Sequence, residues 1–147
     1  MALLSLGMFT AARSPASAQP AVLGAVTPNP VAQRAWMTVG QRRFAITLAD
    51  TTAARAFAAA MPLSLDMAEL NGNEKHADLD QPLPVSPSVP GTIRNGDLLL
   101  YGAKTVVVFY ATLDSRYTYT RLGRVDDPTA LAQALGNQGA RVTFSLK

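Results

Sequence analysis

Two tyrosines and an arginine occupy alternate positions in one short segment, at Tyr117, Tyr119 and Arg121. In an extended strand, side chains at this spacing lie on one face. A guanidinium there can hold a carboxylate or a peptide carbonyl, and phenol rings supply contact area for an extended or proline-containing peptide. The spacing therefore predicts a ligand-binding face on one strand, with Asn71 and Glu74 of a neighbouring hairpin at its rim.

The same residues also allow a structural interpretation. The two tyrosine rings can pack on the domain, and Arg121 can pair with an acid such as Asp97. The proline-rich segment 81–90 either covers the face as a lid or forms a rigid surface connection, and the second reading is favoured.

Covalent chemistry has few candidate side chains. The chain contains no cysteine and a single histidine, His76. A Ser-His-Asp triad needs a base that is held by a third group, and zinc needs three or four nitrogen or sulfur ligands. We therefore expect no catalytic residue, no metal site and no cofactor, and we expect His76 to be a partly exposed strand or loop residue.

The acidic residues have simple structural interpretations at this stage. Asp126 and Asp127 precede a helical segment and are expected to act as a cap and a partner of the helix dipole. Four other acids surround one predicted hairpin, and their spacing identifies no acid–base pair. We expect these to be solvated: Glu69, Glu74, Asp78 and Asp80.

Strand and turn patterns dominate the elements that must position these side chains. Trp36–Val39 and Arg43–Leu48 alternate around a Gly40-Gln41 turn and predict an opening hairpin. Leu63–Met67 and Glu74–Leu79 form a second pair, joined by Asn71-Gly72, a dipeptide typical of tight turns. Further strands are expected at 98–101, 105–110, 117–124 and 142–146, with a hairpin signal at Asn95-Gly96 and the most buried strand at 105–110.

Two short helices complete the pattern. Asp50 is the predicted N-cap of a helix over 51–60, which Pro62 ends. Asp127 and Pro128 predict the start of a second helix, which ends at Gly136. Because the strands are short and no strand–helix–strand unit repeats, the chain is expected to be mainly β, with a closed antiparallel barrel.

Several short motifs resemble, in order, those of small bacterial cyclophilin-like proteins, a family without an established activity. The resemblance covers about residues 36–146 and implies an eight-stranded barrel capped by two helices. The motifs are Trp36 with Gly40, Thr47 with Asp50, Met61-Pro-Leu63, Leu70-Asn-Gly72 with Glu74, Gly91 with Ile93, Gly96-Asp97, Leu100-Tyr101, Phe109-Tyr110, Tyr117, and Tyr119-Thr-Arg-Leu-Gly123.

The resemblance does not extend to the isomerase machinery. Peptidyl-prolyl isomerases of this architecture carry a Phe-His-Arg segment, whose arginine polarises the prolyl nitrogen. No Phe-His-Arg occurs in this chain, and His76 lies in a Lys75-His-Ala-Asp78 context. The catalytic residues of the isomerases therefore have no counterparts here.

Charge excludes a further class of function. The 147 residues include 13 Lys+Arg and 10 Asp+Glu, which gives a formal net charge of +3. The basic residues are scattered along the chain, whereas a nucleic-acid interface concentrates them on one face. We therefore expect no nucleic-acid partner.

The first residues predict export. Residues 2–12 are uncharged and apolar, about as long as the hydrophobic region of a signal peptide and too short to span a bilayer. Ala16-Ser-Ala18 resembles a cleavage site. We predict a signal peptide over 1–18, a Pro/Ala-rich linker over 19–35, a barrel domain over 36–147, and an exported mature form, periplasmic or secreted, without a membrane span. An apolar helix packed on the domain is the alternative.

Three functions agree with these features. The first is a non-catalytic module that binds a peptide or a small acidic ligand. The second is a divergent prolyl isomerase in which Arg121 replaces the missing arginine. The third is a structural or subunit-interaction domain, and the oligomeric state stays open between them.

Overall fold

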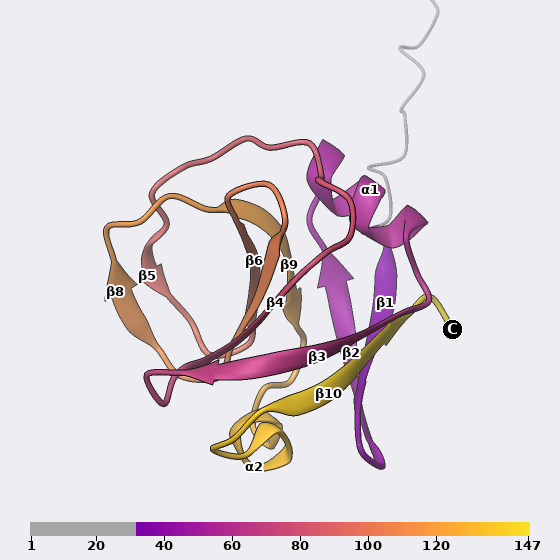
Figure 1. Ribbon diagram of the computed structural model, residues 1–147, viewed down its shortest axis with the longest axis vertical. Helices are drawn as coiled ribbons and strands as arrows, with labels where there is room; N and C mark the ends of the chain where they lie inside the picture. Colours follow the sequence, from indigo (N-terminus) through magenta and orange to yellow (C-terminus); the bar gives the residue numbers. More distant parts are fainter. Residues whose placement is uncertain (1–31) are drawn as a thin grey trace, which may run out of the picture. The chain divides into compact units, whose positions relative to one another are not determined.

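The structure, a computed structural model, describes residues 32–147, and its centre is a closed barrel (Figure 1). Eight strands follow the order β1-β10-β3-β4-β7-β6-β9-β2, with every neighbouring pair antiparallel. This confirms the predicted mainly β, eight-stranded barrel. The strands are β1 (Arg34–Val39), β2 (Arg42–Leu48), β3 (Leu63–Leu70), β4 (Glu74–Asp78), β6 (Asp97–Tyr101), β7 (Thr105–Phe109), β9 (Thr120–Val125) and β10 (Ala140–Ser145).

Alternating side chains fill the barrel. The alternation predicted for Arg43–Leu48 is present in β2, where Phe44, Ile46 and Leu48 share one face and are all buried in the main core. Strand β7 is buried on both faces, because Val106 and Val108 belong to the main core and Val107 and Phe109 to a second cluster. Burial on both faces explains why this run is continuously apolar instead of alternating.

The second cluster lies outside the barrel, beneath a separate pair of strands. β5 (Gly91–Ile93) pairs with β8 (Leu113–Ser115) and not with β6. The predicted Asn95-Gly96 turn is present, since Asp97 N donates to Arg94 O at 2.9 Å, but the expected hairpin is wrong. The Asp97 carboxylate closes this turn by accepting from Arg94 N at 2.9 Å, and the turn leads β5 away from the barrel.

Helix α1 (Thr52–Ala59) packs against the core near β1 and β2 (Figure 1). The predicted cap, Asp50, is wrong: the Thr51 hydroxyl accepts from Ala54 N at 3.0 Å. Thr51 is favoured because its hydroxyl also donates to Arg121 O at 3.0 Å, which fastens the helix to β9. Asp50 instead pairs with Arg55 at 2.7 Å on the surface.

Helix α2 (Leu131–Leu135) lies at the other end of the barrel (Figure 1). It starts later than the predicted Asp127–Gly136 segment, and Ala130 is its N-cap. Asp127 does not cap the helix, since its carboxylate accepts from Thr129 N at 3.1 Å and from the Thr129 hydroxyl at 2.6 Å. These bonds form a turn before the helix, and they lower the pKa of Asp127.

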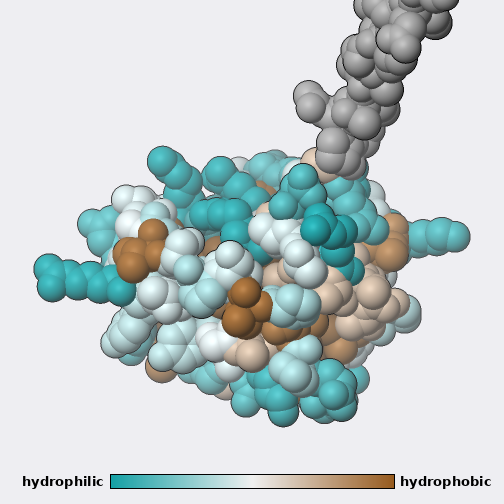
Figure 2. All heavy atoms as spheres, turned by 90° about the horizontal axis from the view of Figure 1, so that it is seen from above, coloured by the Kyte–Doolittle hydropathy of each residue, from teal (hydrophilic) through white to brown (hydrophobic). Residues whose placement is uncertain are grey.

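The proline-rich segment 81–90 is fastened to the barrel along its length. Leu83 N donates to Ala103 O at 2.8 Å, and Ser86 N donates to the Thr120 hydroxyl at 3.0 Å. Ser88 and Tyr119 exchange two backbone hydrogen bonds of 2.9 Å each. These contacts favour the rigid surface connection over the lid. Seen from above, the surface is a mixture of hydrophilic side chains and small separate hydrophobic patches (Figure 2).

The predicted signal peptide and nearly all of the predicted linker lie outside the described residues, so export stays a prediction. Within residues 32–147, no helix is long and apolar enough to cross a membrane.

Candidate functional site

A groove of about 1070 Å³ lies on the outer face of the barrel, beside β8. Residues of β4, β7 and the end of β6 line it on the barrel side, and β8 with the segment that follows it lines the opposite side. Its volume lies slightly above the usual range for small-molecule sites, about 300–1,000 Å³, so it has room for several residues of an extended peptide.

Strand β4 supplies polar side chains to the groove through its pleat. Glu74, His76 and Asp78 alternate along the strand and all line the groove. Lys75 lies between them, points into the barrel and is fully buried. The register sets Glu74 opposite Phe109 of β7 and His76 opposite Val107, so the outward stripe of β4 lies directly beside the second hydrophobic cluster.

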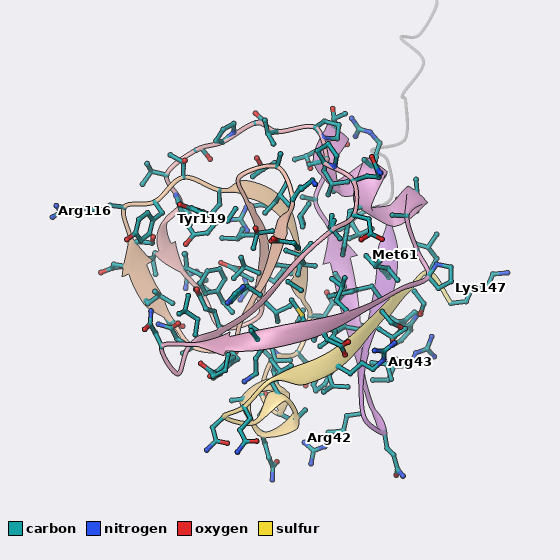
Figure 3. The ribbon with its side chains drawn as sticks, viewed as in Figure 1. Arg42, Arg43, Met61, Arg116, Tyr119 and Lys147 are labelled. Atoms are coloured by element: carbon teal, nitrogen blue, oxygen red, sulfur yellow. The ribbon has the colours of Figure 1, made fainter. Side chains whose placement is uncertain are left out.

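Three tyrosine rings gather at one end of the groove. Tyr101 ends β6, and its ring centroid lies 5.7 Å from that of Tyr119 and 6.3 Å from that of Tyr117. Tyr119 is held from below by an edge-to-face contact with Phe109 at 5.8 Å. In Figure 3, Tyr119 lies between β8 and the barrel. Tyr119 is thus a fixed support, while Tyr117 is 67% exposed and free to contact a ligand.

The expectation that Tyr117, Tyr119 and Arg121 share one strand is wrong. Strand β9 begins at Thr120, because Tyr119 pairs with Ser88 of the proline-rich loop and Tyr117 belongs to the preceding loop. Both tyrosines still line the groove.

Arg121 does not line the groove with the tyrosines. It stands opposite Leu99 of β6, and its Nη1 lies 3.8 Å from Oδ1 of the buried Asp97. It lines a separate hollow of about 570 Å³ together with Thr47 and Gly123. The pairing with Asp97 is the structural alternative stated from the sequence.

The two predicted rim residues do line the groove. Asn71 occupies the tight turn between β3 and β4 with a φ of 57°, followed by Gly72 at 69°. Glu74 follows that turn and is partly buried. Burial raises the pKa of Glu74; nearby His76 opposes this shift, and the charge of Glu69 adds to it. Four of the five predicted site residues therefore meet at this groove.

Several polar side chains of the groove were not among the predicted site residues, including His76, Asp78 and Tyr101. The alternation of β4 was a signal for the first two, since both lie at even spacing from the predicted Glu74. Tyr101 had no local signal, because it comes beside Tyr119 only through the pairing of β6 with β9.

A second polar group, which we name the polar plug, consists of Glu69, Lys75 and Tyr110. The fully buried Lys75 ammonium donates to Glu69 Oε1 at 2.8 Å and to Gly136 O at 2.7 Å, and lies 4.9 Å from the Tyr110 ring centroid. The Tyr110 hydroxyl donates to the same Glu69 oxygen. The plug corrects the expectation that Glu69 is simply solvated, and it joins the barrel end to the C-terminus of α2.

The Glu69 carboxyl group and the Tyr110 phenol of the plug both have shifted pKa values. Burial opposes the ionisation of Glu69, but hydrogen bonds from Lys75, Tyr110 and Gly72 N outweigh it and lower its pKa to about 2. Burial and the neighbouring Glu69 raise the pKa of Tyr110 to about 12. At neutral pH the Glu69 carboxyl group is therefore ionised and the Tyr110 phenol is protonated.

Comparison with known proteins gives one match. A family model described as the cyclophilin-like family matches residues 37–147, which contain all but the first residues of the barrel. No curated protein and no solved structure matches the chain significantly. Among residues 32–147, no group of three His, Cys, Asp or Glu side chains is arranged to hold a metal ion.

Proposed function

Since this chain belongs to the cyclophilin-like family and has an open groove on the outer face of its barrel, we propose that it is a non-catalytic module that binds an extended peptide segment in that groove. The cluster of Tyr101, Tyr117 and Tyr119 carries this proposal. Tyrosine is well suited to a peptide contact, because its ring buries apolar surface at a small cost in side-chain entropy and its hydroxyl can bond a peptide group.

The distribution of rigid and open residues supports a binding role. Tyr119 is 8% exposed and packs on Phe109, whereas Tyr101 and Tyr117 are 49% and 67% exposed. An anchored ring beside two accessible rings gives a surface that is formed before the ligand arrives, which lowers the entropic cost of binding. The fastened loop at Ser88 holds the backbone of Tyr119 in place.

The polar groups of the groove support binding without covalent chemistry. His76 is the single imidazole of the chain, and it makes no side-chain hydrogen bond to a serine or a carboxylate within residues 32–147. A nucleophile needs a base in hydrogen-bond reach and a third group to orient that base. The groove has instead the pattern of a recognition site, in which apolar rings are combined with a few fixed polar groups.

Peptide binding is tested by titrating the full chain against a library of fluorescently labelled peptides and following fluorescence polarisation. Tyr117→Ala should weaken the best-binding peptides about tenfold, because it removes an exposed ring from the groove. Val89→Ala is the matched control, since Val89 is 58% exposed and lies on the loop outside the groove. Equal affinities for wild type and Tyr117→Ala, or no binding by any peptide, would reject the proposal.

A further inference from the structure

Three carboxylates line the groove without a cationic partner. Within residues 32–147, none of Glu74, Asp78 and Asp114 forms an ion pair. Asp78 accepts from the Thr105 hydroxyl at 2.6 Å, and Asp114 accepts from the Thr92 hydroxyl at 2.9 Å. These neutral donors orient the two carboxylates and leave their negative charge uncompensated. The groove is therefore locally acidic although the chain carries a net charge of +3.

Besides His76 of β4, one basic side chain from the described part of the chain lines the groove, and it does not neutralise these acids. This residue is Arg116, which follows β8. Figure 3 shows its side chain projecting away from the barrel. No ion pair joins it to a carboxylate among residues 32–147. The field inside the groove therefore favours a positive charge.

The tyrosine rings and the carboxylates are neighbours through strand register. Tyr101 of β6 stands opposite Thr105 of β7, and Thr105 stands opposite Asp78 of β4. Because adjacent strands lie about 4.8 Å apart, the backbones of Tyr101 and Asp78 are separated by about 10 Å. An ammonium group above the exposed face of a tyrosine ring is attracted by the ring quadrupole and can reach a carboxylate at this separation. The tyrosine rings and the Asp78 carboxylate therefore attract a cation in two independent ways, through the ring quadrupole and through the negative charge.

We infer that the groove selects a peptide segment with a lysine side chain, whose apolar stem lies along the tyrosine rings and whose ammonium group faces Asp78. This inference rests on the peptide-binding role proposed above and specifies its ligand class. An organic cation fits better than a metal ion, because the described residues hold no group of three metal-ligating side chains. Arg121, the cation expected to hold an acidic ligand, lies in the separate hollow with Asp97.

The test compares three labelled peptides that differ only at one central position, which is lysine, the neutral isostere norleucine, or glutamate. Isothermal titration with the full chain should give an affinity about tenfold higher for the lysine peptide than for the norleucine peptide, and a lower affinity again for the glutamate peptide. Asp78→Asn should reduce the preference for lysine over norleucine to less than about threefold. Asp80→Asn is the matched control, since Asp80 is an exposed acid outside the groove.

Salt gives a second readout. The preference for lysine should fall between about 20 mM and about 500 mM NaCl, because the paired charges are partly exposed to solvent and are screened. If all three peptides bind equally, or if Asp80→Asn reduces the preference as much as Asp78→Asn, lysine selection is wrong and the peptide-binding role stands. If none of the three binds at millimolar concentration, both proposals are wrong.

Discussion

Glu69 and Glu74 flank the same tight turn, yet folding shifts their pKa values in opposite directions. Glu69 lies near the end of β3 with its side chain in the polar plug, where Lys75, Tyr110 and Gly72 N donate to it and lower its pKa to about 2. Glu74 starts the next strand in the groove and forms no ion pair within residues 32–147, and burial raises its pKa although nearby His76 opposes the shift. The same hairpin therefore carries one carboxylate that is fixed by hydrogen bonds, Glu69, and one that lines the groove without an ion pair, Glu74.

The difference arises from the pleat and not from residue type. Successive side chains of a strand point to opposite faces, so the strand that places Lys75 inside the barrel places Glu74 and His76 outside. Inside, a charge survives only with a close partner, because desolvation is costly. Outside, an unpaired charge is tolerated because water solvates it. At this hairpin the paired acid, Glu69, supports the fold, and the acid without an ion pair, Glu74, is the one that the proposed binding role uses.

The largest expected difference between the two carboxylates is in the free energy of unfolding after each is removed. Glu69→Ala should lower the free energy of unfolding by about 3 kcal/mol, because the Lys75 ammonium stays buried with Gly136 O as its remaining hydrogen-bond acceptor. Glu74→Ala should change it by less than about 0.5 kcal/mol. Urea unfolding followed by tryptophan fluorescence measures both values. Similar losses for the two variants would contradict the assignment of Glu69 to support and Glu74 to binding.

A double variant tests the cause of the loss at Glu69. Lys75→Met with Glu69→Gln removes both charges, so it should be more stable than Glu69→Ala by at least about 1 kcal/mol. If the double variant is the less stable of the two, the buried ammonium does not account for the loss.

The dependence of the unfolding free energy on pH should show that the ionisation of Glu69 stabilises the fold and that of Glu74 opposes it. The pKa of Glu69 falls from 4.5 to about 2 on folding, so its stabilising contribution is complete above pH 4.5 and is lost as the pH falls towards about 2. The pKa of Glu74 is raised above 4.5, so its ionisation opposes folding as the pH rises past this value. Unfolding free energies measured across this range should give a flatter acid limb for Glu69→Gln.

The Glu74→Gln variant should show a different dependence of stability on pH. Glu74→Gln should be slightly more stable than wild type at neutral pH and unchanged in strong acid, where both forms are neutral. A loss of stability at neutral pH would show that Glu74 has a stabilising partner and would remove the contrast with Glu69.

A smaller effect is expected from single hydroxyl groups. Tyr110→Phe removes the donor to Glu69 and should destabilise the protein by about 1 kcal/mol. Tyr117→Phe, at an exposed ring in the groove, should leave the stability within about 0.5 kcal/mol of wild type. Thermal unfolding compares the two, and equal midpoints for both variants would place Tyr110 outside the plug.

The smallest expected effect is the coupling between the two acids. The charge of Glu69 contributes to the raised pKa of Glu74, and His76 opposes it. Glu69→Gln should therefore lower the pKa of Glu74, and His76→Ala should raise it. NMR titration of the Glu74 side-chain carboxyl carbon measures both shifts, and a shift of the wrong sign in either variant contradicts the proposed electrostatics.

Local patterns predicted much of the barrel. Alternation gave the inward face of β2, the β-branched run gave β7, and Asn71-Gly72 gave the turn between β3 and β4. The predicted cap of α1 was wrong because two neighbouring residues, Asp50 and Thr51, both suit an N-cap, and only the Thr51 hydroxyl also donates to Arg121 O. Local propensity cannot choose between such neighbours.

The candidate site was predicted only in part, because local patterns identified some of its residues and not their neighbours in space. Asn71 and Glu74 follow from their hairpin, and the aromatic character of Tyr117 and Tyr119 indicated a contact surface. Arg121 was assigned to that surface through strand alternation, but a register shift between Leu98 and Leu99 and the nearby Asp97 direct it elsewhere. A register shift between two strands does not change the alternation of apolar and polar residues within either sequence, so it could not be predicted from that alternation.

By itself, the sequence determined that this protein forms a mainly β barrel of the cyclophilin-like family, because alternation and turn residues act over a few neighbouring positions. Tertiary structure alone decided which polar residues meet: Tyr101 with Tyr119, and Lys75 with Gly136. Those pairs are far apart along the chain, and they come together only when barrel closure sets the register of the strands and places α2 at the barrel end.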